Sequence, residues 1–442
     1  MTDSNHQVRI NARWDHDEFP TGETNQRGLL LEIEADKPKH QKKKKRPALN
    51  LAIVIDRSGS MGNGRLEAAK EAAIGIVNCL NRHDHLSVVV YDCEVNVLVD
   101  GQRQDKGARR QTTKLINSVY TGGTTNLSGG WLRGARCVAD VMDRRNIKAG
   151  HVILLSDGHA NRGETDPEEL RRLSSGLASR GVTSTCVGIG NHYSPLQLNA
   201  IAEAGEGEMH HSDQPSEIIE VVTGELGEAT LLVARNFSVS LQLPYGVAAR
   251  QLTNYRGEDF EDRHECFVGN LVGGQQRTLA FLVELPIYAD PRTLTFSCTA
   301  NWLDAETAME EHTIQQEFEL LVVPMQDFDE NKRNKDVARA IADLWMASHA
   351  YQAMLLNERG LYDEATSVFD ADDERFSRMT AGLVESAKLR RTRTASRERV
   401  ASEWRGASKL EAMSLSRKAA RSKPDFRRRR RENRWTDFKP EE

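Results

Sequence analysis

The chain has 442 residues and a formal net charge of −5, and its 38% of hydrophobic residues is enough for folded cores. This length predicts two or three domains. The chain contains no run of about 18 apolar residues, so we expect no membrane-spanning helix. Residues 1–27 are polar and do not resemble a secretory signal. The cysteines stand singly, without a C-x-x-C pair, which is typical of reduced thiols and predicts a cytoplasmic protein.

Residues 1–48 carry two strand signals. Val8–Ala12 alternates apolar and polar residues, and Leu29–Glu34 is a second strand-like run. Both precede a long stretch of alternating strand and helix signals. We therefore expect them to belong to a separate β domain that is completed later in the chain. The lysine-rich stretch between Pro38 and Pro47 predicts a solvated loop.

The strongest signal in the chain is LNLAIVIDRSGSM, from Leu49 to Met61. Six of its first seven residues are apolar and several are β-branched, which predicts a buried strand of a parallel sheet. Asp56 ends this run, and Ser58 and Ser60 follow on the turn. Ligands of open α/β sheets bind at the carboxyl ends of strands. Because oxygen ligands suit hard cations, the stretch predicts a site for Mg²⁺ or Mn²⁺.

Residues 49–232 alternate strand and helix signals, which predicts an α/β domain with a doubly wound, mostly parallel sheet. Two more polar turns lie in this domain. One contains Thr124 and Thr125 after two glycines, and the other places Asp157 directly after an apolar run. Further along, Asp166 and Pro167 form a typical helix start, with Asp166 as the N-cap.

The helical periodicity disappears in residues 233–325, where short alternating runs are broken by Pro, Gly and Asp. This pattern predicts an antiparallel β-sandwich or a small barrel, and we expect the sandwich. Together with residues 1–48 it would make one β domain, with the α/β domain inserted between its parts. Residues 326–415 predict a helical region, in which Val337, Ile341, Leu344 and Trp345 share one apolar stripe.

Residues 416–442 form a basic, arginine-rich tail. From Arg390 to the end there are 18 Lys and Arg against 8 Asp and Glu, a balance of +10 that leaves −15 for the rest of the chain. Arginine-rich segments pair with phosphates and fold on binding RNA. Nucleic acid is therefore one candidate partner, through Arg427, Arg428, Arg429, Arg430 and Arg431. The alternative is a tail that is solvated or binds protein.

The residues 49–232 resemble the von Willebrand factor A family. Asp56-Arg57-Ser58-Gly59-Ser60 matches the D-x-S-x-S motif of its metal ion-dependent adhesion site. Residues 122–127, GGTTNL, resemble the threonine loop of the family, and residues 154–158, LLSDG, resemble its aspartate turn. The three motifs stand in the order and spacing of the family. The likeness is to bacterial members related to the inter-α-trypsin inhibitor heavy chain and calcium-activated chloride channel families.

This resemblance implies a metal site whose ligands are Asp56, Ser58, Ser60, Thr125 and Asp157. In the family the two serines coordinate the ion directly and the first aspartate reaches it through water. Thr124 remains an alternative to Thr125, because the doublet leaves the register open by one residue. Arg57, Met61 and Thr124 flank the site and are expected to contact a partner.

The sequence lacks the motifs of the common enzyme classes. It contains no G-x-S-x-G elbow, no Walker loop and no dinucleotide fingerprint, so we expect no enzyme. The resemblance implies a divalent-cation-dependent protein-binding module, in which a partner's Asp or Glu completes the coordination of Mg²⁺ or Mn²⁺. We expect an intracellular regulatory or assembly factor. The alternative is a nucleic-acid-associated protein that binds through the arginine tail.

Overall fold

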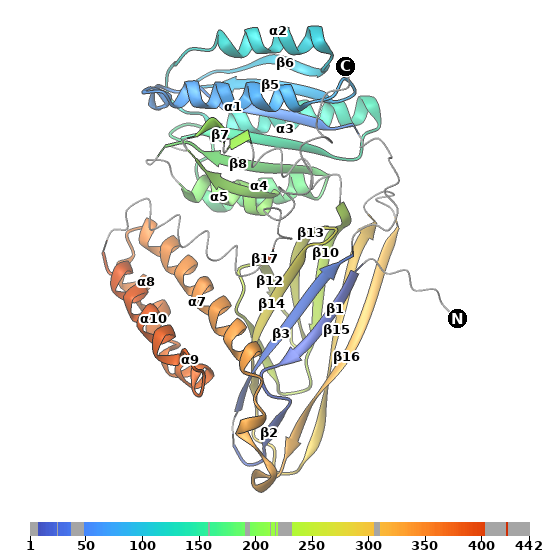
Figure 1. Ribbon diagram of the computed structural model, residues 1–442, viewed down its shortest axis with the longest axis vertical. Coiled ribbons are helices and arrows are strands. Elements are labelled where there is room, and N and C mark those ends of the chain that lie inside the picture. Colours follow the sequence, from blue (N-terminus) through green and yellow to red (C-terminus); the bar gives the residue numbers. More distant parts are fainter. Residues whose placement is uncertain are drawn as a thin grey trace. The chain divides into compact units, whose positions relative to one another are not determined.

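The computed structural model describes residues 8–23, 25–36, 48–157, 160–190, 195–212, 214–216, 218–219, 232–304, 310–402 and 421–422. The chain divides into two compact units (Figure 1). One is an α/β unit, and the other combines the N-terminal strands with the later strands and the C-terminal helices. None of the helices in the described part of the chain is both long and apolar enough to cross a membrane.

The α/β unit contains a six-stranded sheet in the order β6-β5-β4-β7-β8-β9. Every neighbouring pair is parallel except β5 and β6, which are antiparallel. The predicted doubly wound, mostly parallel sheet is therefore confirmed. Its strands are β4 (Asn50–Asp56), β5 (His85–Tyr91), β6 (Val95–Arg103), β7 (Gly150–Ser156), β8 (Val182–Gly188) and β9 (Glu206–His211), and its helices are η1 (Gly59–Met61), α1 (Arg65–Cys79), α2 (Lys106–Asn117), α3 (Leu127–Arg145), α4 (Pro167–Ala178) and α5 (Pro195–Ala204).

The central strand β4 is buried along its whole length. Its odd-numbered apolar residues, such as Ile53, pack with α1, while Val54 lies so close to α3 that a side chain at Gly134 would overlap it. Two helices on opposite faces explain why the strand is a continuous apolar run and not an alternating one. The run ends at Asp56, which brings this carboxylate to the carboxyl edge of the sheet.

The second unit is a β-sandwich of two sheets. One has the order β1-β3-β14-β11, with β17 also pairing with β14, and the other has the order β12-β13-β10-β15-β16-β2. β3 pairs with β14 along ten residues, and β2 pairs with β16. Strands from before and after the α/β unit thus share both sheets. The strands are β1 (Val8–Trp14), β2 (Glu18–Pro20), β3 (Asn25–Ala35), β10 (Leu232–Gln242), β11 (Ala248–Gln251), β12 (Arg256–Asp259), β13 (Arg263–Val272), β14 (Gln276–Leu285), β15 (Arg292–Asp304), β16 (Glu311–Val323) and β17 (Arg421–Ser422).

The C-terminal helices pack on the outer face of the β3–β14 sheet. Leu30 and Leu282 from the sheet share an apolar cluster with Ile341 and Trp345 of α7 and with Phe376 of α9. The helical region and the sandwich, which the sequence predicts as separate segments, are joined by this cluster in one compact unit. The helical elements are η2 (Met325–Asp327), η3 (Glu330–Lys332), α7 (Lys335–Glu358), α8 (Tyr362–Asp370), α9 (Asp373–Thr380) and α10 (Ser386–Val400).

A buried polar cluster ties these helices to β11. The Arg250 Nη1 group donates to Asp372 Oδ2 at 2.6 Å, and His349 Nε2 lies 3.3 Å from the same oxygen. Arg393 of α10 contacts His349 Nδ1 at 2.9 Å and donates to the carbonyl of Phe369. Burial raises the pKa of Asp372, but the hydrogen bonds with His349 and Arg250 outweigh it and hold the pKa well below its ordinary value.

Asp372→Asn is expected to lower the free energy of unfolding by about 1–3 kcal/mol at pH 7, because it removes the charged acceptor of a buried cluster. A carboxylate with a depressed pKa stabilises the fold above its unfolded pKa and loses that effect as the pH falls. The difference between wild type and variant should therefore shrink as the pH drops below about 4. Urea unfolding across this pH range measures it. The control is Asp363→Asn, at an exposed position in the first turn of α8, which should differ from wild type by less than about 1 kcal/mol throughout.

Candidate functional site

Asp56 lies at the end of β4 with no exposed surface and accepts hydrogen bonds on both oxygens. The Ser58 backbone N–H donates to Oδ1 at 2.8 Å. The hydroxyls of Ser156 and Tyr91 donate to Oδ2 at 2.7 and 3.1 Å. Tyr91 ends β5 and is paired in register with Asp56, and Ser156 ends the neighbouring strand β7. Three adjacent strand ends thus build the pocket that holds this carboxylate.

The charge on Asp56 is costly in this pocket. Burial raises its pKa to about 6, although hydrogen bonds from Ser58 and Ser156 act in the opposite direction. The nearby carboxylate of Asp157 raises the pKa further. The hydrogen-bond donors to Asp56 are all neutral, so a divalent cation at this edge would favour the charged form.

Ser58, Ser60 and Asp157 form a chain of hydrogen bonds. The two serine hydroxyl oxygens lie 3.0 Å apart, and the Ser60 hydroxyl donates to Asp157 Oδ1 at 2.9 Å. The other oxygen of Asp157 accepts from Arg65 Nη1 at 3.3 Å. With the Ser58 backbone bond to Asp56, the structure brings together four of the five predicted ligands.

The threonine loop is fixed beside these residues by its backbone. The Gly59 N–H donates to the Gly123 carbonyl at 2.9 Å, and the Gly122 N–H donates to the Arg57 carbonyl at 2.6 Å. Thr125 is buried and Thr124 is exposed. Its buried position favours Thr125 as the ligand of the pair. Among the contacts of the described residues, however, none joins the Thr125 hydroxyl to the other four side chains, so its role stays a prediction.

The donor set fits a hard divalent cation. Neighbouring ligands of an octahedral Mg²⁺ at about 2.1 Å are separated by about 3 Å, which is the spacing of the Ser58 and Ser60 hydroxyls. In the described part of the chain, no group of three His, Cys, Asp or Glu side chains could hold a metal ion. A cation at this edge would therefore depend on neutral hydroxyl oxygens, with carboxylates behind them.

The sequence profile of the von Willebrand factor type A domain matches residues 50–223. Those residues form a von Willebrand factor type A (VWA) domain. Such domains are generally metal-dependent protein-interaction modules. The resemblance drawn from the D-x-S-x-S, threonine and aspartate motifs is thus confirmed.

Relatives of known sequence or structure extend beyond the VWA domain. The uncharacterized protein YfbK of Escherichia coli is 27% identical over 274 residues, which cover 59% of this chain and 46% of YfbK. Human inter-alpha-trypsin inhibitor heavy chain H3 is 26% identical over 270 residues, 59% of this chain and 29% of that protein. The chain therefore spans less than half the length of these curated relatives.

A solved structure shows the same fold over nearly the whole chain. It is described as von Willebrand factor type A from Catenulispora acidiphila, and it matches with a TM-score of 0.62 at 20% identity. The match covers 96% of this chain and 99% of that one. At this identity the likeness shows the fold alone.

The three residues expected to contact a partner, Arg57, Met61 and Thr124, differ in how exposed they are and in what they contact. Met61 has no exposed surface and packs in the core with α1, so the expectation that it contacts a partner is wrong. Arg57 forms an ion pair with Asp92 at 3.3 Å, and its guanidinium lies 5.9 Å from the ring centroid of Tyr120. Thr124 and Tyr120 are exposed, so both are accessible to a partner.

Several residues that build the site were missed by the sequence analysis. Tyr91 and Ser156 hold Asp56, and Arg65 holds Asp157. Asp92 braces the threonine loop, because its carboxylate accepts from the Gly123 N–H at 3.2 Å and pairs with Arg57. Tyr91, Asp92 and Ser156 all lie at strand ends next to β4. Their position at the ends of strands next to β4 was the sequence signal that could have identified them as part of the site.

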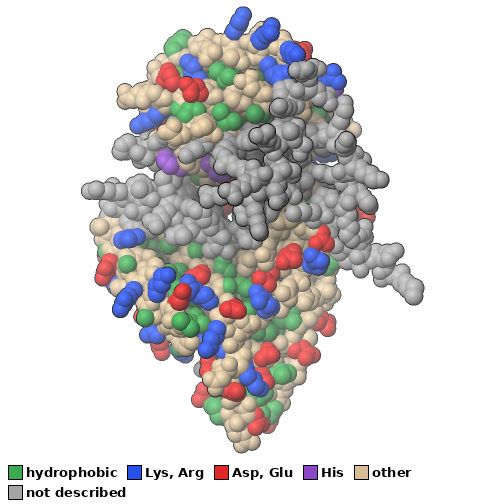
Figure 2. Space-filling model, in the orientation of Figure 1, with side chains coloured by type: hydrophobic (Ala, Val, Ile, Leu, Met, Phe, Trp, Pro, Cys, Tyr) green, Lys and Arg blue, Asp and Glu red, His purple; other side chains and the backbone are tan. Residues whose placement is uncertain are grey.

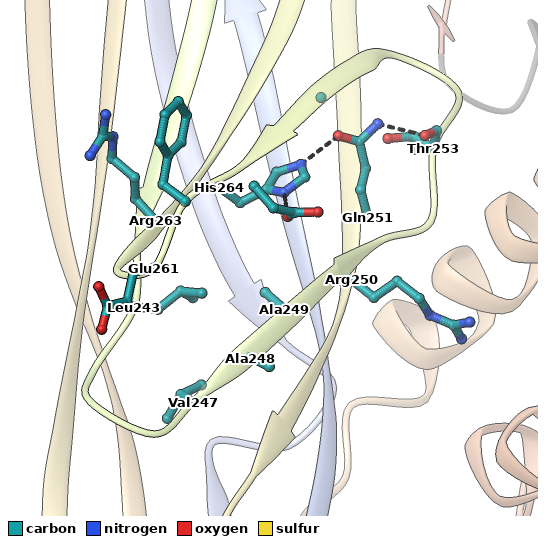
Figure 3. Close-up of a pocket in the computed structure, with 13 residues that line it drawn as sticks. Leu243, Val247, Ala248, Ala249, Arg250, Gln251, Thr253, Glu261, Arg263 and His264 are labelled. Atoms are coloured by element: carbon teal, nitrogen blue, oxygen red, sulfur yellow. Dashed lines mark hydrogen bonds and ion pairs between the residues drawn. The ribbon is translucent and has the colours of Figure 1, made fainter.

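The sandwich contains a separate pocket of about 540 Å³ beside β11 and the β12–β13 hairpin (Figure 3). At its wall, the ring of His264 lies between Asp259 and Gln251, with hydrogen bonds to both. The Gln251 amide donates onward to the carbonyl of Thr253. These polar groups satisfy one another, which indicates that they stabilise the hairpin.

Gly122→Ala is expected to weaken Mn²⁺ binding by at least about tenfold and to lower the free energy of unfolding by about 1–3 kcal/mol. A Cβ atom at Gly122 would overlap the carboxylate of Asp92, so the threonine loop must shift. Titration calorimetry and urea unfolding measure the two effects.

The control for this variant is Gly176→Ala. Gly176 lies inside α4 with open space around it, so alanine should raise stability by about 0.5–1 kcal/mol. Its Mn²⁺ affinity should equal that of wild type. If Gly122→Ala bound Mn²⁺ as tightly as the control, the threonine loop would have no part in the site.

Proposed function

We propose that the VWA domain binds a protein partner through Mg²⁺ or Mn²⁺ held by Ser58, Ser60 and Thr125. An Asp or Glu side chain of the partner completes the coordination. A bound cation supplies an open coordination position and a positive charge that attracts a carboxylate oxygen. The proposed role is binding and not catalysis.

The charge balance of the site is the observation that supports this proposal. The hydroxyls of Ser58 and Ser60 are neutral, and the two carboxylates, Asp56 and Asp157, carry one negative charge each. Arg65 neutralises part of this charge, because its guanidinium donates to Asp157. Two negative charges and one positive charge leave a divalent cation with one unit of positive charge unbalanced. An incoming carboxylate removes this imbalance, whereas a neutral group does not.

The exposed rim fits a protein partner. Tyr120 is 72% exposed and stands beside the guanidinium of Arg57, which is an arrangement typical of interface hot spots. With Thr124 it would form the contact surface around the cation. We propose that the module acts in regulation or assembly, and the cytoplasmic location expected from the sequence stays a prediction.

Nucleic-acid binding remains the alternative function. The run Arg427–Arg431 that favours it lies outside the described residues, so nucleic-acid binding also stays a prediction. On the described part of the face seen in Figure 2, the Lys and Arg side chains are mostly interspersed with Asp and Glu, apart from a group of Lys and Arg at the upper end. That mixture favours the protein-binding role for the described part of this face.

Asp56→Ala tests the proposed function. It removes the main counter-charge of the site and should abolish cation-dependent binding, with a change in the free energy of unfolding within about 1–2 kcal/mol. A cell extract is passed over the immobilised protein in Mg²⁺ and in chelator, and over the variant in Mg²⁺. A partner that depends on the cation is retained in the first case and lost in the other two. Substitution of the acidic residues of that partner then identifies the coordinating carboxylate.

Thermal melts of both proteins are the control for folding. Wild type should gain stability on addition of Mg²⁺, and Asp56→Ala should gain none. Retention of the same proteins in all three conditions, with normal melts, would falsify cation-mediated recognition.

A further inference from the structure

We propose that Arg65 is a built-in counter-ion of Asp157, which sets the cation affinity of the VWA domain. The guanidinium and a divalent cation compete for the charge of the same carboxylate. This inference rests on the proposed function and adds a residue to it that none of the motifs contains. Arg65 lies five residues after the last serine of the D-x-S-x-S motif, at the first position of α1.

The contacts of Arg65 join it directly to two of the predicted ligands. Its Nη1 group donates to Asp157 Oδ2 at 3.3 Å and to the backbone carbonyl of Ser60 at 2.8 Å. Asp157 is 1% exposed, while the Arg65 side chain is 26% exposed. Water cannot fully screen an ion pair with one buried partner, so the positive charge acts strongly on this carboxylate.

The side chain of Arg65 also lies against a glycine, Gly190. Its guanidinium stem packs against Gly190, which follows β8 and has a φ of +87°. A Cβ atom at Gly190 would lie 2.7 Å from Arg65 Nε, so a larger residue there would press on the arginine side chain. Gly190 therefore leaves space for the guanidinium beside Asp157.

The two carboxylates of the site differ in their donors. Asp56 accepts from a backbone N–H and from the hydroxyls of Ser156 and Tyr91, which are all neutral. Asp157 accepts a neutral hydroxyl on one oxygen and the cationic guanidinium on the other. Asp56 therefore offers its full charge to a cation, whereas Asp157 offers a charge that Arg65 has already balanced in part. Loss of the guanidinium would release that charge to the cation.

The test uses the full chain and Mn²⁺ alone, with affinity measured by titration calorimetry. Arg65→Gln removes the guanidinium and should tighten Mn²⁺ binding by roughly threefold to tenfold, because the full charge of Asp157 then acts on a cation a few ångströms away. Arg65→Lys keeps the charge and should stay within about twofold of wild type. Arg172→Gln, at an exposed arginine of α4 that pairs with Glu169, is the matched control and should leave the affinity unchanged.

A second variant separates competition for Asp157 from a general field effect. In an Asp157→Asn background, Arg65→Gln should change Mn²⁺ affinity by less than about twofold, because the shared carboxylate is gone. An equal gain in Mn²⁺ affinity in the wild-type and Asp157→Asn backgrounds would overturn the proposed competition for Asp157. Weaker or unchanged binding by Arg65→Gln, or the same gain for Arg65→Lys, would also overturn it.

Thermal melts give a readout that does not depend on a binding isotherm. Without metal, Arg65→Gln should melt below wild type, because Asp157 has lost its counter-ion. With saturating Mn²⁺ the variant should show the larger increase in Tm. Wild type that binds no Mn²⁺ would overturn the proposed function as well. Normal binding by wild type, with no effect of Arg65→Gln, would overturn only the role of Arg65.

Discussion

A carboxylate buried at the end of the central strand is the constraint around which the carboxyl edge of the α/β sheet is built. Removing an ionised carboxylate from water costs several kcal/mol even after relaxation, so such a group needs donors on every side. Asp56 receives them from its own turn and from the ends of both neighbouring strands. Burial raises its pKa to about 6, because these neutral donors do not fully replace water. A cation bound at this edge of the sheet would offset that deficit.

The donors themselves depend on close packing around them. Tyr91 reaches Asp56 from β5 because Gly130 of α3 leaves room for its ring, which a Cβ atom there would overlap. Asp92, the next residue, lies against Gly122 in the same way. Two glycines from different segments thus allow one strand end to hold both the buried carboxylate and the threonine loop. Cation-site geometry and core packing are therefore parts of the same arrangement.

The sequence predicted those features whose signal is local. The apolar run before Asp56 and the serines two and four residues later lie in one stretch, so strand, turn and donor set could be inferred together. Tyr91, Asp92 and Arg65 were missed because each acts through a partner distant in the sequence, and pairing across strands is not visible in one sequence. Met61 was misplaced because the short helix η1 turns its side chain into the core.

The neutral hydroxyls at the front of the site have a thermodynamic consequence. In the proposed site, where Arg65 balances Asp157 in part, a bound cation would be held by less negative charge than it carries. Its affinity would then depend on the charge that a partner supplies. A partner carboxylate that filled the open coordination position would strengthen cation binding, and by linkage the cation would strengthen partner binding by the same factor. A site with more carboxylates would hold the ion tightly but lose this coupling, because the partner would then have little charge left to balance.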